Sequence, residues 1–245
     1  MIYLKKAWKL SDEEARRFRA KEVEVLDPYR KSQLYGEFVT MQRPGFEKMM
    51  NLVNNWVNEL SKNGQISELF EIRARIKAIE SAVYNDARKA LDDVFGMEII
   101  TATEEEVEII VSKILENTEV VREKNHNKKN GYKAQHKLLG LTKEKCKEMQ
   151  LSDEEISNMP LVEMQFKTME VAVKSSGGTA DHSLYKGETK EGVQSKYDAN
   201  GFKKPFNVPT MWVSKDGKMV ELSTNETLKK MYPFLKVKDN QKEVK

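Results

Sequence analysis

The sequence predicts a single α/β or α+β domain that begins with a helical portion. Apolar residues recur at helical spacing in the first part of the chain, and short apolar runs typical of strands alternate with helix-start signals after it. A strand–turn–strand pattern follows near the end. This order predicts a helical region over 1–65, a core over 66–190, a hairpin and helix packed on that core over 191–235, and a frayed tail over 236–245.

Helices are expected before the first strand. The series from Ser11 to Glu14 is a capping box with acidic side chains at the positive end of the helix dipole. Pro28 and Pro44 are expected to interrupt the helical pattern, and the next helix runs from Phe46 to Leu60. A further helix is expected over 66–91, where apolar residues form one stripe. Both stripes are typical of a buried core rather than of a ligand site.

Strands and helices alternate in the remainder of the chain. The expected strands are Phe95–Thr101, Tyr132–Leu141 and Leu161–Thr168, and a basic loop is expected over Arg122–Gly131. The sequence Lys215-Asp216-Gly217 predicts the turn of a late hairpin. The expected helices follow the capping or start residues Thr103, Ser152, Met169 and Ser223.

Composition excludes several classes of protein. The 42 Lys and Arg residues nearly balance the 39 Asp and Glu residues, so the net charge of +3 does not by itself indicate nucleic acid. The single cysteine, Cys146, rules out an internal disulfide framework and a thiolate metal cluster, and the three histidines form no zinc-like cluster. No apolar run approaches the ~20 residues that span a bilayer, and no signal core is present, so we expect a cytoplasmic protein.

The first candidate site lies on the helix expected over 66–91. Lys77 and Ser81 are four residues apart, and Arg88 returns to nearly the same side of a helix as Lys77. With Arg75, these side chains offer guanidinium, ammonium and hydroxyl groups, which suit a polyphosphate. The alternative is an ordinary solvated basic face.

The second candidate site is the strand that contains Glu163, Gln165 and Lys167. Alternation along a strand places these side chains on one face, and Met164 and Phe166 on the other. An acid, an amide and a cation in a row would serve a metal-assisted phosphoryl transfer. The alternative is a half-exposed strand with a polar outer face.

Two shorter patterns complete the candidate sites. Tyr132 and His136 share a strand face, and the small Ala134 between them is expected to leave space for a base to stack on the tyrosine ring. Asp93 lies at an expected helix-to-strand junction, where a carboxylate could hold Mg²⁺ together with substrate phosphates. The alternatives are an aromatic residue at the edge of the core and a turn with solvent-facing acids. The basic residues expected to attract phosphates here are Lys128, Lys129, Lys133 and Lys137.

In their order along the chain, these patterns resemble the synthetase domain of the RelA/SpoT alarmone synthetases, from about Arg73 to Lys186. Because no hydrolase-type His-Asp half is present, we expect a small stand-alone synthetase, with a toxin-like small synthetase as an open alternative. The motifs that carry the resemblance are Arg75-x-Lys77-x₃-Ser81, Asp93-x-x-Gly96, Gly131-Tyr132-x₃-His136, Glu163-x-Gln165-x-Lys167-Thr168 and His182-x-x-Tyr185-Lys186.

The resemblance implies a nucleotidyltransferase-like mixed β-sheet flanked by helices. It also implies an enzyme that uses Mg²⁺ and transfers the β,γ-pyrophosphate of ATP to the ribose 3′-hydroxyl of GDP or GTP, which makes (p)ppGpp. No membrane is expected as a partner, and a homo-oligomer or a neutralising antitoxin partner is left open.

The resemblance further implies a role for each matching residue. Asp93 and Glu163 are the implied metal ligands and catalytic carboxylates, and Glu163 helps the 3′-hydroxyl to attack. The implied ATP-binding residues are Arg75, Lys77, Ser81 and Arg88. The implied acceptor-binding residues are Tyr132, which stacks on the guanine, Lys133, His136, Gln165 and Lys167. A family signature without individual roles is formed by His182, Tyr185 and Lys186.

Two positions depart from the family pattern. Glu98 stands where the family usually has an arginine that stacks on the donor adenine, and Asn85 stands where it has a lysine. Each change removes a positive charge from the donor side. Two alternatives therefore stay open: transfer to the 3′-end of tRNA, gripped by the basic segment 122–137, and a catalytically degenerate module that binds nucleotide or RNA.

Overall fold

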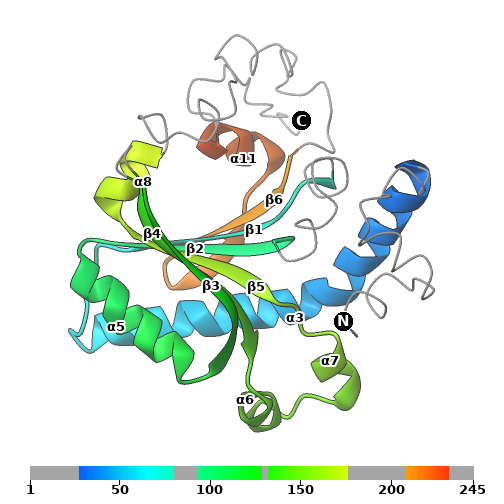
Figure 1. The fold of residues 1–245 in the computed structure, drawn as a ribbon, viewed down its shortest axis with the longest axis horizontal. Helices are drawn as coiled ribbons and strands as arrows, with labels where there is room; N and C mark the ends of the chain where they lie inside the picture. Colours follow the sequence, from blue (N-terminus) through cyan, green and yellow to red (C-terminus); the bar gives the residue numbers. More distant parts are fainter. Residues whose placement is uncertain (1–27, 80–92, 129–131, 176–207, 232–245) are drawn as a thin grey trace, which may run out of the picture.

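A seven-stranded mixed β-sheet forms the middle of the part of the molecule that is described (Figure 1). The structure is a computed structural model and describes residues 28–79, 93–128, 132–175 and 208–231. The strand order is β3-β4-β5-β2-β1-β6-β7, in which β2 and β5 are parallel and the other neighbours are antiparallel. This sheet with its flanking helices confirms the predicted fold class. The strands are β1 (Glu71–Ile76), β2 (Phe95–Thr101), β3 (Thr118–Asn127), β4 (Lys133–Leu141), β5 (Val162–Thr168), β6 (Thr210–Lys215) and β7 (Lys218–Glu221).

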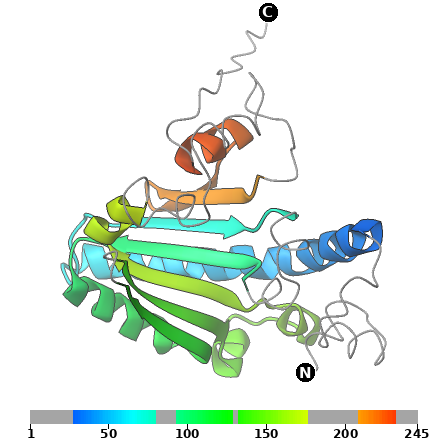
Figure 2. The ribbon, with the colours of Figure 1, turned by 45° about the horizontal axis from the view of Figure 1, so that its top comes forward.

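Helices cover both faces of the sheet (Figure 2). On one face lie α3 (Pro28–Lys62) and α5 (Glu104–Leu115), and on the other lie α8 (Met169–Ser175) and α11 (Thr224–Met231). Two short helices, α6 (Lys143–Glu148) and α7 (Asp153–Ser157), lie between β4 and β5 in the chain. The main hydrophobic core fills the layer between the sheet and the pair α3 and α5. Its largest fully buried side chains include Phe46, Met49, Ile72, Phe95, Met97, Ile110, Ile114 and Phe166.

The helix α3 is continuous through Pro44, so the predicted interruption at Pro44 was wrong. Pro28 begins the helix, where its missing N–H has no intrahelical partner to lose, and Pro44 lies inside the helix. Phe38 and Phe46, on either side of Pro44, are both buried and both contact Phe95 of β2. Packing against the sheet therefore outweighs the hydrogen bond that the proline removes.

Gly45 sets how closely α3 approaches the segment that leads into β5. A Cβ atom at Gly45 would lie 3.0 Å from Met159 Sδ and from Pro160 Cδ, and 3.2 Å from the carbonyl oxygen of Asn158. Only glycine fits this approach without a shift of the neighbouring chain. The close approach fixes the start of β5, the strand that carries Glu163.

The strand β1 replaces the first part of the helix predicted over 66–91, so that part of the prediction was wrong, and residues 80–91 lie outside the described residues. β1 pairs antiparallel with β2 on one side and with β6 on the other. Its alternate residues Ile72, Ala74 and Ile76 are buried in the core. Because side chains alternate along a strand, Arg75 lies on the opposite face, directed away from α3 and α5.

The edge strand β3 occupies Arg122–Asn127 of the basic loop predicted over Arg122–Gly131, so the prediction was also wrong there, and residues 129–131 lie outside the described residues. β3 pairs antiparallel with β4, with an irregularity between Val120 and Arg122. Thr118 is its one buried residue. A strand with so little burial carries no alternation of apolar and polar residues, which is why composition suggested a loop.

The other elements predicted within the described residues are confirmed. They are β2, α5, β4, α7, β5, α8, the β6–β7 hairpin and α11. Thr103 forms the predicted capping box at α5, and Ser152, the predicted start of α7, forms a capping box as well. The hairpin turn has positive φ at Asp216 and Gly217, as the turn sequence predicted. The capping box predicted at Ser11 lies outside the described residues.

None of the helices in the described ranges combines the length and the apolar character that crossing a membrane requires.

Candidate active site

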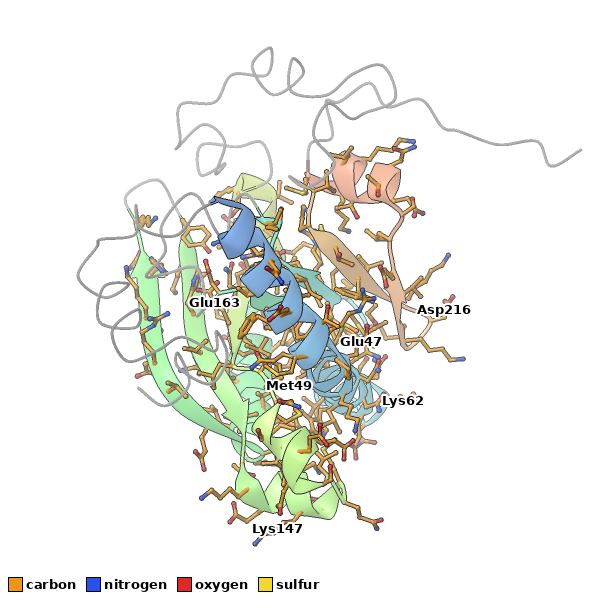
Figure 3. The ribbon with its side chains drawn as sticks, turned by 90° about the vertical axis from the view of Figure 1, so that its right-hand side faces the viewer. Glu47, Met49, Lys62, Lys147, Glu163 and Asp216 are labelled. Atoms are coloured by element: carbon orange, nitrogen blue, oxygen red, sulfur yellow. The ribbon has the colours of Figure 1, made fainter. Side chains whose placement is uncertain are left out.

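Charged and polar side chains line the face of the sheet that is directed away from α3 and α5. Residues that are directly opposite one another in a sheet place their side chains on the same face. Glu163, Gln165 and Lys167 of β5 lie on this face together, and Figure 3 shows Glu163 well away from Lys147 in α6 and Asp216 in the hairpin turn. Two neighbouring rows run across the strands, one with Arg73, Glu98, Gln165 and His136 and the next with Arg75, Gly96 and Glu163.

Lys77 and Asp93 form an ion pair at one end of this face. The Nζ atom of Lys77 lies 2.7 Å from Oδ2 of Asp93. The backbone of Lys77 is held from two sides, because its N–H donates to the carbonyl of Val94 and the hydroxyl of Tyr35 in α3 donates to its carbonyl. The Oδ1 atom of Asp93 is buried and has no hydrogen-bond partner among the described residues. A carboxylate oxygen in that environment suits a cation or a donor that arrives with a ligand.

Arg75 reaches across β2 toward Glu163. Gly96 lies between them in the register, and the Nε atom of Arg75 is 3.4 Å from the position that a Cβ atom would take at Gly96. Burial alone would raise the pKa of Glu163, but His136, Gln165 and Arg75 outweigh burial and lower it to about 2. Glu163 is therefore an anion at neutral pH.

Glu163, His136 and Tyr132 form a chain of contacts from β5 into β4. The Nδ1 atom of His136 lies 3.8 Å from Oε1 of Glu163, and the hydroxyl of Tyr132 lies 2.8 Å from Nε2 of His136. The amide of Gln165 donates to Oε2 of Glu163 at 3.0 Å. Burial, with the negative charges of Glu98 and Glu163, raises the pKa of Tyr132, so its hydroxyl keeps its proton. The structure thus brings these four residues together.

Glu98 is enclosed by two cations. The Nη1 atom of Arg73 lies 3.0 Å from Oε2 of Glu98, and Lys167, whose side chain is 5% exposed, forms an ion pair with Oε1. Burial would raise the pKa of Glu98, but Lys167 and Arg73 outweigh burial and lower it. The series of ion pairs continues on β1, where Nη2 of Arg73 lies 2.7 Å from Oε2 of Glu71. Glu71 in turn pairs with Lys230 of α11. The carboxylate that replaces the expected arginine is therefore neutralised, and Arg73 supplies a guanidinium on the neighbouring strand.

His126 joins Tyr132 and His136 in a cluster of three rings. His126 lies opposite Ala134 in the register of β3 and β4. Its ring centroid is 4.4 Å from that of His136 and 5.8 Å from that of Tyr132. Ala134 is buried. The prediction of open space beside Ala134 was therefore wrong, because β3 brings the imidazole ring of His126 to that position.

Lys133 lies apart from the other predicted acceptor residues. Its side chain is exposed, and its Nζ atom lies 2.6 Å from Oε2 of Glu104 in α5, which covers the opposite face of the sheet. The remaining predicted site residues lie outside the described residues and are Ser81, Arg88, His182, Tyr185 and Lys186.

Sequence reasoning missed Tyr35, Arg73 and His126 as site residues. Arg73 shares the alternation of β1 with Arg75, but the helical prediction concealed it. His126 fell within the predicted loop. The contact of Tyr35 with Lys77 joins residues 42 positions apart, and no local pattern in the sequence signals it.

Asp93 and Glu163 suit a divalent cation. The Oδ1 atom of Asp93 lacks a hydrogen-bond partner among the described residues, and the low pKa of Glu163 keeps it anionic. Mg²⁺ is commonly bound by one or two carboxylates together with substrate phosphates and water. In the described ranges, no three His, Cys, Asp or Glu side chains are grouped so that they could hold a metal ion.

A polar face that gathers cations, carboxylates and aromatic rings on a mixed sheet is typical of a protein that binds a phosphorylated ligand. Residues 65–190 match the family model described as the region found in RelA / SpoT proteins. The chain belongs to this RelA/SpoT family. The matched segment contains β1 to β5, which carry most of the polar face. No curated protein matches the sequence.

Several solved structures are similar to this chain. Small alarmone synthetase 1 from Bacillus subtilis is 19% identical over 65% of this chain and 84% of that one, with a TM-score of 0.48. The same enzyme bound to its product pppGpp is 18% identical over 66% and 87%, with a TM-score of 0.48. A GTP pyrophosphokinase family protein from Streptococcus pneumoniae is 18% identical over 66% and 83%, with a TM-score of 0.48.

Proposed function

We propose that this chain transfers the β,γ-pyrophosphate of ATP to the ribose 3′-hydroxyl of GDP or GTP and so makes (p)ppGpp. Membership of the RelA/SpoT family supports a transferase of this kind. The observation that carries the proposal is the series of charged and aromatic side chains on one face of the sheet: Lys77, Asp93, Arg75, Glu163, His136 and Tyr132.

The donor end of the proposed site is formed by Arg75, Lys77 and Asp93. Arg75 and Lys77 bind the triphosphate, because a guanidinium pairs with two phosphate oxygens and an ammonium supplies a compact charge. The Nζ atom of Lys77 pairs with Oδ2 of Asp93. With nucleotide and Mg²⁺ bound, the ammonium of Lys77 would pair with phosphate, and the carboxylate of Asp93 would be free to hold the metal ion. Mg²⁺, held by Asp93 and Glu163, would neutralise the charge of the transferred phosphates.

The acceptor end is formed by Tyr132, His136, Gln165 and Lys167. The guanine base stacks on the ring of Tyr132, whose centroid lies 5.9 Å from Nζ of Lys167. His136 and Gln165 hold the carboxylate of Glu163 beside the ribose. The two ends then place the acceptor hydroxyl in line with the β-phosphorus of ATP, which is the main requirement of this chemistry.

In the transfer step, the 3′-oxygen forms a bond to the β-phosphorus of ATP. The bond from that phosphorus to the oxygen that bridges the α- and β-phosphates breaks, and AMP leaves with the bond's electron pair. Glu163 accepts a hydrogen bond from the 3′-hydroxyl. As the new bond forms, the proton of that hydroxyl passes by way of the Glu163 carboxylate to solvent water. Because its pKa of about 2 makes Glu163 a weak base, its contribution is chiefly to orient and polarise the hydroxyl.

ATP labelled at the β-phosphate tests the proposal. The protein is incubated with this ATP and Mg²⁺, and with GDP, GTP or deacylated tRNA as the acceptor. We expect label in guanosine tetra- or pentaphosphate, with unlabelled AMP as the second product. Label in tRNA alone would replace the proposed acceptor, and nucleotide binding without any transfer would identify a degenerate binding module.

A transfer to the 3′-end of tRNA is the second candidate function, and one observation favours it. In the register of β3 and β4, Lys124 lies opposite His136 and Arg122 lies opposite Leu138. Basic residues of the edge strand thus continue the face that carries Glu163, in a position to meet a phosphate backbone longer than a mononucleotide. If RNA is the acceptor, Arg122→Gln lowers tRNA labelling and weakens its salt dependence, while labelling of GDP is unchanged.

A further inference from the structure

We infer that His126 is a positioning residue of the acceptor pocket, because its ring holds Tyr132 and His136 in the arrangement that receives the acceptor base. The inference rests on the proposed function for the identity of the ligand, a guanine nucleotide. Its geometry comes from the pairing of β3 and β4.

His126 is more buried than its neighbours on β3. Residues 119–127 of the edge strand β3 are exposed except for His126, which is half-buried. Its register partner in β4 is Ala134, whose small side chain leaves room on the sheet for the imidazole. An otherwise solvated strand therefore directs one ring into the site.

His126 contacts two residues of the proposed site, Tyr132 and His136. Its ring planes meet those of His136 and Tyr132 at 64° in both cases, with centroid distances of 4.4 Å and 5.8 Å. Edge-to-face contacts of this kind favour a defined ring orientation. Tyr132 and His136 are joined to each other by the 2.8 Å contact between the hydroxyl and Nε2. His126 thus completes a closed set of three contacts.

The surroundings of His126 favour its uncharged form. Burial is the largest cause of a lowered pKa at His126, the neighbouring His136, Lys124 and Lys128 lower it further, and Glu163 acts in the opposite direction. His126 is therefore a neutral ring near neutral pH. Its contribution comes from packing against its neighbours rather than from attraction to phosphate.

Two substitutions at His126 and one control test the inference by direct binding, without turnover. Isothermal titration calorimetry measures the Kd of GDP, and separately the Kd of a non-hydrolysable ATP analogue, for each protein. We expect His126→Ala to raise the Kd of GDP about tenfold, because it removes two ring contacts. His126→Phe, which keeps a ring, stays close to the wild type. The Kd of the ATP analogue is unchanged in both, and Asn125→Ala, an exposed neighbour on β3, changes neither value.

Each contrary outcome has a distinct meaning. Wild-type affinity for GDP in His126→Ala overturns the inference. So does equal weakening in His126→Phe and His126→Ala, because the imidazole nitrogens and not the ring would then be responsible. Equal loss of GDP and ATP-analogue binding in His126→Ala, with a lowered Tm, would show a merely structural role and also overturn it. Failure of the wild type to bind GDP would instead reject the proposed function, and with it this role of His126.

Discussion

Glu163 is the residue on which the proposed transfer depends most. Glu163→Gln keeps the size of the side chain and removes the charge that orients the 3′-hydroxyl. We expect the transfer rate to fall by about 10²- to 10⁴-fold, with circular dichroism unchanged. Glu47→Gln, in a half-exposed ion pair with Arg43 on α3, is the control and keeps the wild-type rate. Unchanged turnover in Glu163→Gln would remove Glu163 from the mechanism.

Glu163 also links the stability of the protein to pH. Its pKa is about 2 in the folded protein and about 4.3 in an unfolded chain. A carboxyl group with a depressed pKa stabilises the fold above its unfolded pKa, and this contribution is lost as the pH falls through the folded pKa. We therefore expect the wild type to lose about 3 kcal/mol of unfolding free energy between about pH 5 and pH 2 through this group. Urea denaturation across that range measures it, and an equally steep loss in Glu163→Gln would contradict the assignment.

Glu98 stabilises the fold as the shared ion-pair partner of Lys167 and Arg73, a role that its position in the sequence does not suggest. Glu98→Gln leaves the buried Lys167 and its neighbour Arg73 without their shared carboxylate. We expect a loss of about 3 kcal/mol or more of unfolding free energy, because removing one partner leaves a buried charge uncompensated. The control Glu221→Gln breaks an exposed pair with Arg43 and should cost less than about 1 kcal/mol. Equal losses in guanidinium denaturation would show that Glu98 is not a buried ionic partner.

Among the elements, α3 reaches the site from outside the family-matched segment. The hydroxyl of Tyr35 donates to the carbonyl of Lys77, the residue paired with Asp93. Tyr35→Phe removes that one hydroxyl, and a hydrogen bond of this kind is worth about 0.5–1.5 kcal/mol. We expect the KM for ATP to rise about 3- to 10-fold, while the KM for the acceptor does not change. A matched rise in both values would mean that Tyr35 supports the fold in general and not the donor end.

How well each element could be predicted depended on its burial. β2, β5 and α5 carry apolar residues at the period of their own structure, and α5 begins at a full capping box. The sequence of β1 predicts a helix because its buried Ile72 and Ile76 are four residues apart. This spacing equals two periods of the alternation along a strand and about one turn of a helix, so it fits both structures. β3 has almost no buried residues, and in α3 tertiary packing overrides Pro44.

Some residues of the candidate site could be predicted from the sequence, and others could not. Glu163, Gln165 and Lys167 could be placed on one face from alternation alone, since β5 is a strand in both the prediction and the structure. The contacts of His126 and Glu98 depend on which strands are neighbours. Strand order depends on the packing of the whole sheet, and the spacing of residues within one segment does not predict it.

In the whole molecule, the elements on either side of the family-matched segment are joined to each other and to the site. Asn54 of α3 donates to the carbonyl of Gly217 and accepts from the hydroxyl of Ser214, which ties the β6–β7 hairpin to the helix. Lys230 of α11 pairs with Glu71, at the end of the charged series that leads to Glu98. The helices α3 and α11 thus lie on opposite faces of the sheet (Figures 1 and 2). Both elements take part in fixing β1 and its cations.

We propose above all that Asp93 and Glu163 share one divalent cation at the donor end of this face. Anomalous diffraction at the manganese edge, from crystals grown with Mn²⁺ and a non-hydrolysable ATP analogue, tests it directly. The account predicts one peak about 2 Å from carboxylate oxygens of both residues, with Lys77 moved from Asp93 to the phosphates. A manganese peak elsewhere, or a bound nucleotide with Lys77 and Asp93 still paired, would contradict it.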